Sequence, residues 1–374
     1  MQTRYLSLLL SALLFSCLPL AAQDFSEVDA RARKTPFPKK QNIDQLAASL
    51  TEGLRTEKEK VRAFYVWITA NIRYDVKTFE NKREIDPTEK DALQAPEQVL
   101  RRKMGVCAGY ANLFQALCDA SDIEAIRVTG IVKNHRGRIP RIGHAWNLVR
   151  ADSQWGLIDA TWGAGDVDTD AGKYTPRFKE DYFFAAPETL ILNHYPNDPL
   201  FQLLPAPLTP EEFRQGQAAV QQTVSDNDAD ETRAVYAPKD SLDAFVRLDS
   251  AAQLLHSSLR IVRFDPGNNM GLWGLAWSQY SAAIDNLQRV QQEMNGLALD
   301  PRNPELAAVL DRNIDRFSAA ETHLNACLAT ADKITTAGGY HKAARQLQAT
   351  ARKNLLECAK SKEVLEKTRE RMRK

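Results

Sequence analysis

The sequence predicts an α+β domain, with N-terminal helices packed on an antiparallel sheet, followed by an all-α helical bundle. Two observations lead to this prediction. Between residues 42 and 204, helical periodicity of the apolar residues gives way to three short runs of β-branched and aromatic residues. From residue 241 to 374 the periodicity is helical, with breaks at Asp265-Pro266-Gly267, Asp300-Pro301 and Gly338-Gly339.

The composition argues against a nucleic-acid partner. The chain carries 49 Lys and Arg against 48 Asp and Glu, so it lacks the positive field that binds a phosphate backbone. With 374 residues, of which 44% are hydrophobic, it is long enough for two domains and can bury at least one sizeable core.

The N-terminus has the pattern of a secretory signal peptide over residues 1–22. Arg4 precedes an apolar run from Tyr5 to Leu20, and small residues follow. The run is shorter than the roughly 20 residues of a bilayer-spanning helix, so we expect no transmembrane helix in the mature chain. We therefore expect a periplasmic or secreted protein. Cys17 could instead become a lipidated N-terminus, although the apolar run continues beyond it.

Helices are expected first in the domain of residues 42–204, after an extended polar lead-in over residues 23–41. Thr56 and Glu59 form a capping-box pattern, which predicts that a helix begins there and continues along an apolar stripe. The charged stretch 81–91 is expected to be a surface loop.

A glycine-flanked turn at residues 105–109 then leads into a strongly periodic helix. Short polar segments separate the three strand patterns that follow, as in antiparallel hairpins: Ile126–Val132, His144–Val149 and Trp155–Thr161. Residues 181–204 are aromatic and proline-rich, which predicts irregular structure, with His194 packed on the edge of the domain.

Prolines and acidic residues over 205–240 predict a linker. Helices are expected beyond it over residues 241–263, 268–297, 303–335 and 338–372. No motif assigns a role to this helical C-terminus. It could shield a cleft, bind a partner or associate with a second copy of itself.

Cys107 has the strongest chemical context of the four cysteines beyond the signal peptide. At a helix start, unpaired N–H groups and partial positive charge favour the thiolate and can hold an oxyanion. Gly105 beside it would let a substrate backbone approach. Cys118 should share the helix at about 16 Å, too far for a disulfide. Whether Cys327 and Cys358 pair is left open by the sequence.

His144 and Asp159 are expected to meet on one face of neighbouring strands. A turn at residues 151–154 places them opposite or diagonal to each other, with Trp146 among the apolar side chains around them. A carboxylate on one ring nitrogen fixes the histidine tautomer and leaves the other nitrogen free to take a proton from a thiol. A structural hydrogen bond would also explain a buried pair. The order Cys, His and Asp on a helix and two strands is more specific evidence for a catalytic site than the buried His–Asp pair alone.

These motifs resemble the transglutaminase-like superfamily, which has a papain-like thiol fold. The resemblance covers about residues 42–204 and rests on three segments in order: Gly105-Val-Cys107-Ala-Gly-Tyr110, His144-Ala-Trp-Asn147 and Trp155-Gly-Leu-Ile-Asp159-Ala-Thr-Trp162. Residues 182–204 are similar to the kyphoscoliosis-peptidase branch. The resemblance implies a triad with Cys107 as nucleophile, His144 as base and Asp159 as orienting carboxylate.

Positions that bind substrate or an oxyanion are implied near the triad, although for two of them, Trp67 and Tyr74, a core position is favoured. The full set is Trp67, Tyr74, Gly105, Ala108 and Trp146.

We expect no metal and no cofactor. The segment Asp166–Gly172 looks like a calcium loop, but an EF-hand needs Gly and Glu where Ala171 and Arg177 stand.

The expected function is thiol acyl transfer on protein or peptide amides through an acyl-thioester. Water would complete a hydrolysis, and an amine acceptor would give a cross-link. Hydrolysis is favoured because water is always present, whereas an amine must be bound specifically. The alternative is a catalytically silent transglutaminase-like scaffold that binds a protein or a glycan at the cell envelope.

Overall fold

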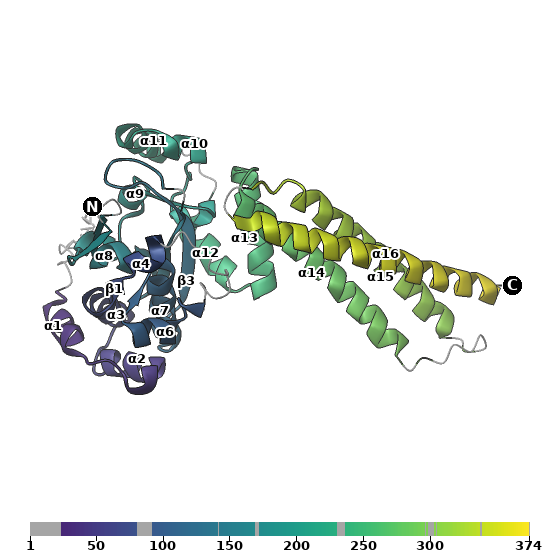
Figure 1. Cartoon of the computed structure of the whole chain (residues 1–374), viewed down its shortest axis with the longest axis horizontal. Coiled ribbons are helices and arrows are strands. Elements are labelled where there is room, and N and C mark those ends of the chain that lie inside the picture. The colour runs from purple at the N-terminus through teal and green to yellow at the C-terminus, as the bar shows by residue number, and fades with distance from the viewer. Residues whose placement is uncertain are drawn as a thin grey trace, which may run out of the picture.

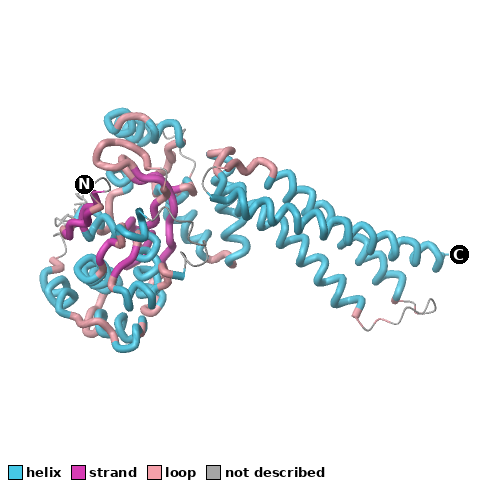
Figure 2. The backbone as a smooth tube through the Cα atoms, in the orientation of Figure 1, coloured by secondary structure: helices cyan, strands magenta, loops and turns pink. Residues whose placement is uncertain are grey.

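A computed structural model describes residues 24–80, 92–140, 142–168, 172–229, 236–295, 297, 303, 305–336 and 339–373. The expected signal peptide with Cys17, the expected surface loop 81–91 and the expected break at Asp300-Pro301 lie outside these residues. The chain folds into an α+β part and a helical part that projects from it (Figure 1). The strands all lie in the first part (Figure 2), so the predicted fold class is confirmed.

Helix α3 (Glu57–Asn71) lies at the centre of the α+β part. Thr56 accepts a hydrogen bond from the N–H of Glu59 at 3.1 Å, and the Glu59 carboxylate accepts one from the N–H of Thr56 at 3.1 Å, which confirms the capping box. Residues 61–69 of the helix are all buried. The helices that pack around them are α1 (Ser26–Lys34), α2 (Ile43–Thr51) and α7 (Cys107–Asp119).

The prediction of an extended lead-in was wrong for α1. This helix has Ala32 as its one buried residue, so its sequence carries little helical periodicity. It is held by α3, whose buried Arg62 donates to both carboxylate oxygens of Asp29 at 2.7 and 2.8 Å. Tertiary contacts of this kind decide a helix that local propensity alone does not specify.

The central sheet has the strand order β5-β4-β3-β8, and every neighbouring pair is antiparallel. Its strands are β3 (Ala125–Val132), β4 (His144–Ala151), β5 (Gln154–Ile158) and β8 (His194–Pro196). The first three confirm the strand predictions, except that the strand expected to reach Thr161 ends at Ile158. The fourth was missed, because three residues in a proline-rich segment are too few to show a period of two.

Both faces of the sheet are covered. Helices α3 and α7 pack with Val149, Ala151 and Ile158 on one face. Trp146, Leu148 and Leu157 face the other way, against α12 (Pro238–Val246) and the 3₁₀ helix η3 (Pro199–Gln202). This burial fixes the register, since a shift by one residue would turn each strand over.

Two short strand pairs complete the α+β part. The parallel pair β1 (Arg73–Tyr74) and β2 (Met104–Gly105) precedes α7 directly. The hairpin of β6 (Gly165–Asp168) and β7 (Lys173–Pro176) follows β5. The remaining short helices are α4 (Val76–Glu80), α6 (Pro96–Arg102), α8 (Ala160–Ala164) and α9 (Pro187–Leu190).

Much of the predicted linker 205–240 is helical, which corrects that prediction. Residues 210–229 form α10 (Pro210–Arg214) and α11 (Gln217–Ala229), which lie at one edge of the α+β part (Figure 1). Phe213 and Val220 are fully buried in a cluster with residues of the sheet region, so the segment folds back onto the domain.

The helical part begins with α12 and α13 (Ser250–Phe264), which replace the single helix expected over 241–263. Asp249 accepts a hydrogen bond from Ala252 N at 2.8 Å and caps α13. The helices α14 (Asn269–Met294), α15 (Leu306–Ala331) and α16 (Tyr340–Arg373) lie side by side and lead away from the sheet (Figure 1).

A buried salt bridge connects the helical part to the α+β part, and the two cysteines of the helical part are unpaired. Arg260 of α13 donates to the buried carboxylate of Asp198 at 2.9 and 2.7 Å, which ties the helices to the segment after β8. Cys327 and Cys358 are both free, so the disulfide that the sequence left open is not formed. No helix in the described ranges is both long and apolar enough to span a bilayer.

Candidate functional site

Cys107 is the first residue of α7. Val106 before it is extended and provides no side-chain cap, so the first N–H groups of the helix have no capping side chain. The parallel pairing of Tyr74 with Gly105 brings β1 to the same point. The sequence prediction that Cys107 lies at an open helix start is therefore confirmed.

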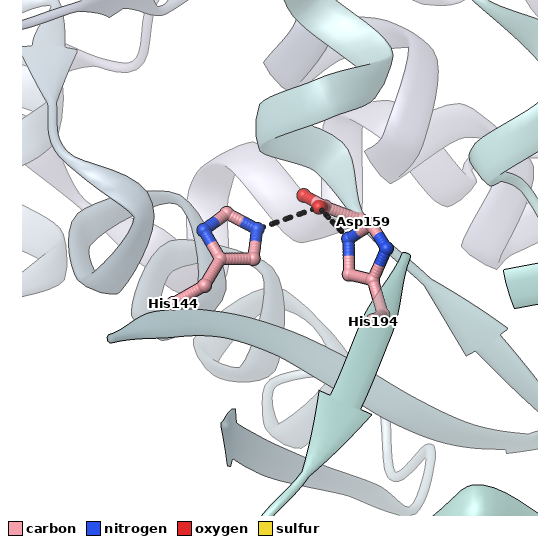
Figure 3. A group of neighbouring side chains, drawn as sticks. All are labelled: His144, Asp159 and His194. Carbon is pink, nitrogen blue, oxygen red and sulfur yellow. Dashed lines mark hydrogen bonds and ion pairs between the residues drawn. The ribbon is translucent and has the colours of Figure 1, made fainter. Parts of the chain in front are cut away.

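His144 opens β4 and lies beside Asp159, as Figure 3 shows. The two are joined by a 2.7 Å hydrogen bond between His144 Nε2 and Asp159 Oδ2. Both residues are buried, at 9% and 1% exposure. A two-residue turn joins the strands, and the predicted proximity of the two side chains is confirmed.

The sequence predicted that Asp159 lies within a strand, and this prediction was wrong. Strand β5 ends at Ile158, and Asp159 caps α8 instead. Its Oδ1 accepts hydrogen bonds from the N–H groups of Thr161 at 2.8 Å and Trp162 at 3.1 Å. Its role as N-cap fixes the carboxylate so that Oδ2 faces the histidine.

The carboxylate is held in its ionised form. Burial would raise the pKa of Asp159, but the charge and hydrogen bond of His144, and the hydrogen bond of a second histidine, hold it well below its usual value. Four donors in all therefore satisfy a fully buried acceptor.

His194 is that second histidine, and Figure 3 shows it on the other side of Asp159. Its Nε2 lies 3.0 Å from Asp159 Oδ2, and it is 1% exposed. Burial lowers the pKa of His194 more than Asp159 raises it. Its Nε2 donates to the carboxylate, and its Nδ1 contacts the side-chain amide of Asn193.

The sequence prediction that His194 packs on the domain edge was wrong. The residue lies on β8, which pairs with β3 in the register Val132↔His194. The one signal in the sequence is the run His-Tyr-Pro, whose histidine and tyrosine are residue types often buried in strands, within a segment of irregular pattern. Nothing local links that segment to β3, some 60 residues earlier.

Cys107 and His144 interact directly. Burial would raise the pKa of the Cys107 thiol, but a hydrogen bond with His144, the charge of His144 and the N–H of Ala145 lower it below its usual value. Burial would lower the pKa of His144, but the charge and hydrogen bond of Asp159, with the bond to Cys107, raise it to about 10. The two pKa shifts together favour a thiolate next to an imidazolium.

His144, Asp159 and His194 also contain three ligand-type atoms within 4.8 Å of one another. Ligands of one tetrahedral zinc ion, at about 2.0–2.1 Å from the metal, would be separated by about 3.3 Å. The N···O separations of 2.7 and 3.0 Å are those of hydrogen bonds. The group is therefore described as a His–Asp–His hydrogen-bond network.

A cleft of about 420 Å³ gives access to Cys107 and His144. Tyr74 and Trp162 line it, with residues of the loop after β3 and of the segment before α11. Burial, and then the charge of Cys107, raise the pKa of Tyr74, so its hydroxyl stays protonated.

The other predicted substrate positions are not in the cleft wall. Trp67 is a fully buried core residue that donates from Nε1 to the carbonyl of Thr35 at 2.8 Å. Trp146 is also buried, and its ring stacks on His144 with centroids 5.8 Å apart. Gly105 is buried in β2, and Ala108 is the second residue of α7. Tyr74 is thus the one aromatic candidate from the sequence that the cleft exposes.

Comparison with known proteins identifies the family of the domain that contains these residues. Residues 44–160 match the family model of the transglutaminase-like superfamily, and the match includes Cys107, His144 and Asp159. The chain contains a transglutaminase-like domain.

Kyphoscoliosis peptidase from Mus musculus is similar to this chain, with 31% identity over 201 residues. The alignment covers 52% of this chain and 29% of the mouse protein, so the chain spans under a third of that relative. The Lim and transglutaminase domain protein ltd-1 of Caenorhabditis elegans is 26% identical over 206 residues, 50% of this chain and 27% of that protein.

Among solved structures, a putative cysteine protease from Cytophaga hutchinsonii is 22% identical. The superposition covers 38% of this chain and 45% of that chain, with a TM-score of 0.26, which is too low to bear on the site.

Proposed function

We propose that the transglutaminase-like domain is a thiol acyl-transfer enzyme that acts on protein or peptide amides. Cys107 is the nucleophile, His144 the base and Asp159 the carboxylate that orients it. One observation carries the proposal. A buried, ionised carboxylate binds one nitrogen of His144, and the same histidine is hydrogen-bonded to a thiol at an uncapped helix start.

The geometry gives each residue its step. Because Nε2 of His144 is bound to Asp159, Nδ1 is the nitrogen available to Cys107. The thiolate attacks the amide carbonyl and forms a C–S bond. N–H groups at the start of α7 and the Tyr74 hydroxyl stabilise the oxyanion. As the C–N bond breaks, His144 gives its proton to the leaving amine.

The second half of the reaction releases the acyl group. His144 takes a proton from water, the hydroxide oxygen attacks the thioester carbonyl, and the thiolate leaves. An amine in place of water would give a cross-link. We favour hydrolysis because no amine needs to be bound, and because the similar mouse protein is named a peptidase. The signal-peptide pattern leads us to place this activity in the periplasm or outside the cell.

An acyl-enzyme experiment tests the proposal. The protein is incubated with p-nitrophenyl acetate at pH 7, and peptide mass spectrometry locates the acetyl group. We expect acetylation of Cys107 that neutral hydroxylamine removes, as it does a thioester. Cys118→Ala is the matched control, since Cys118 is a buried thiol of the same helix and should not be needed. Acetylation that persists in Cys107→Ala, or its absence from the wild type, would contradict the assignment.

A further inference from the structure

Lys133 is a buried cation in the wall of the cleft that contains Cys107. It directly follows β3, and its side chain is 6% exposed. Nζ donates to the carbonyl of Gln215 at 2.7 Å and lies 4.4 Å from the centroid of the Phe213 ring. Over the described ranges, Lys133 forms no ion pair.

A buried ammonium without a carboxylate is costly. Charged groups that leave water are normally paired, and one carbonyl occupies one of the three N–H donors of a lysine. Burial lowers the pKa of Lys133, as expected of a cation without a compensating charge. The other lysine of the cleft, Lys179, differs in this respect, because its Nζ lies 2.5 Å from Asp166 Oδ1.

One further donor in the same cleft lacks an acceptor, and the start of a helix lies beside the cleft. The Thr161 hydroxyl is buried and has no hydrogen-bond partner among the described residues. Helix α11 begins after Gly216, whose carbonyl accepts from Val220 N at 3.1 Å. Glycine has no side chain to cap the first turn, so these N–H groups add positive potential beside Gln215.

We propose that Lys133 is the receptor for a carboxylate that the substrate carries close to the amide attacked by Cys107. The substrate is then an acidic peptide, with either a free C-terminal carboxylate or an Asp or Glu side chain. This inference rests on the proposed function, since it takes Cys107 as the reacting group.

The register gives the approximate spacing. Gly130 lies opposite His144, and the backbone of Lys133 is three residues further along the chain, just beyond the end of β3. At about 3.3 Å per residue this is about 10 Å, the length of about three extended residues. The carboxylate should therefore lie within about three residues of the reacting carbonyl.

Bromoacetyl peptides test the receptor without a known substrate. The thiolate of Cys107 displaces bromide and forms a C–S bond, so the alkylation rate measures binding near the thiol. The probes are bromoacetyl-glycine, -diglycine and -triglycine, each as the free acid and as the amide. Bromoacetyl-Glu-amide and bromoacetyl-Gln-amide form a further pair that tests a side-chain carboxylate.

At pH 7 we expect at least one acid to react about tenfold faster than its neutral partner, the effect of one charge-assisted hydrogen bond. The pair with the largest ratio shows whether the carboxylate is terminal or in a side chain. Lys133→Met should abolish the preference. Lys179→Met, made together with Asp166→Asn so that no carboxylate is left uncompensated, removes the other lysine of the cleft and should keep most of the preference. Near-ultraviolet circular dichroism establishes that both variants are folded.

Equal rates for all acid and neutral pairs in the wild type would overturn the receptor while Cys107 remained reactive. Equal losses in the two lysine variants would also overturn it, because they would mean a general potential rather than a binding residue. Failure of every probe to label Cys107 would instead overturn the proposed function, and the receptor with it.

Discussion

The pairing of Cys107 with His144 should appear in the pH dependence of folding stability. When the protein is folded, the pKa of Cys107 lies below its usual value and that of His144 is raised to about 10. In the unfolded chain the two groups titrate near 8.5 and 6.5. The folded state thus favours the proton on His144, and the unfolded state favours it on Cys107. The two shifts therefore oppose each other in the pH dependence of stability between about pH 6.5 and 8.5.

Cys107→Ala removes this compensation. The folded pKa of His144 remains raised, mainly by Asp159, so its contribution to stability is complete below about pH 6.5 and is lost as the pH rises toward the folded value. Linkage sets the slope at about 1.4 kcal/mol per pH unit for one proton. The free energy of unfolding of the variant, relative to wild type, should fall between pH 6.5 and 8.5 by up to about 2.7 kcal/mol, the limit set by one full proton over two pH units.

Urea denaturation followed by near-ultraviolet circular dichroism, at intervals from pH 6 to 9, measures this difference. Groups shared by the two proteins cancel in it. Cys118→Ala is the matched control, because burial raises the pKa of Cys118 and its thiol is protonated in both states below about pH 8.5. A difference for Cys107→Ala that is as independent of pH as the control would refute the thiolate–imidazolium pair.

Further substitutions test the His–Asp–His hydrogen-bond network and the buried salt bridge between Arg260 and Asp198. Asp159→Asn should slow alkylation of Cys107 by iodoacetamide at pH 7 by about 30-fold, because an ordinary thiol is mostly protonated at that pH. Intact-protein mass spectrometry measures the rate. An unchanged rate would mean that the reactivity of Cys107 does not depend on the carboxylate. His194→Phe should lower the free energy of unfolding by about 1.5–3 kcal/mol, and His194→Gln, which keeps a donor to Asp159, by less. Equal losses of stability for the two His194 variants in urea denaturation would mean that the effect comes from packing and not from the hydrogen bond. Arg260→Met should lower the free energy of unfolding by about 3–5 kcal/mol, because it leaves the Asp198 carboxylate buried without its ion-pair partner. Adding Asp198→Asn should restore part of the melting temperature. No recovery in the double variant would contradict this explanation.

The sequence was sufficient where local pattern and chemistry coincide. The capping box of Thr56 and the glycine-flanked turn before Cys107 specify their helix starts within a few residues. The alternation through β4 and β5 places His144 and Asp159 together, because the turn expected at residues 151–154 puts both side chains on one face.

It was insufficient where a partner lies far along the chain. Helix α1 is polar, and the contact of Asp29 with Arg62 in α3 stabilises it. His194 reaches Asp159 only because β8 pairs with β3, and a three-residue strand has no periodicity to reveal this. The sequence could not show that Lys133 is buried without an ion-pair partner in the described part of the chain. Both properties depend on the segment of α10 and α11, which folds over the lysine side chain.

The pH dependence of Cys107 alkylation by iodoacetamide, in wild type and in His144→Ala, tests the central claim most directly. We predict that the wild-type rate is already on its plateau near neutral pH, because the pKa of Cys107 is lowered by His144. His144→Ala should then react about 30-fold more slowly at pH 7, with a midpoint at or above about 8.5. A wild-type rate that rises only near pH 8.5 and does not change in the variant would contradict a catalytic thiol and favour the scaffold.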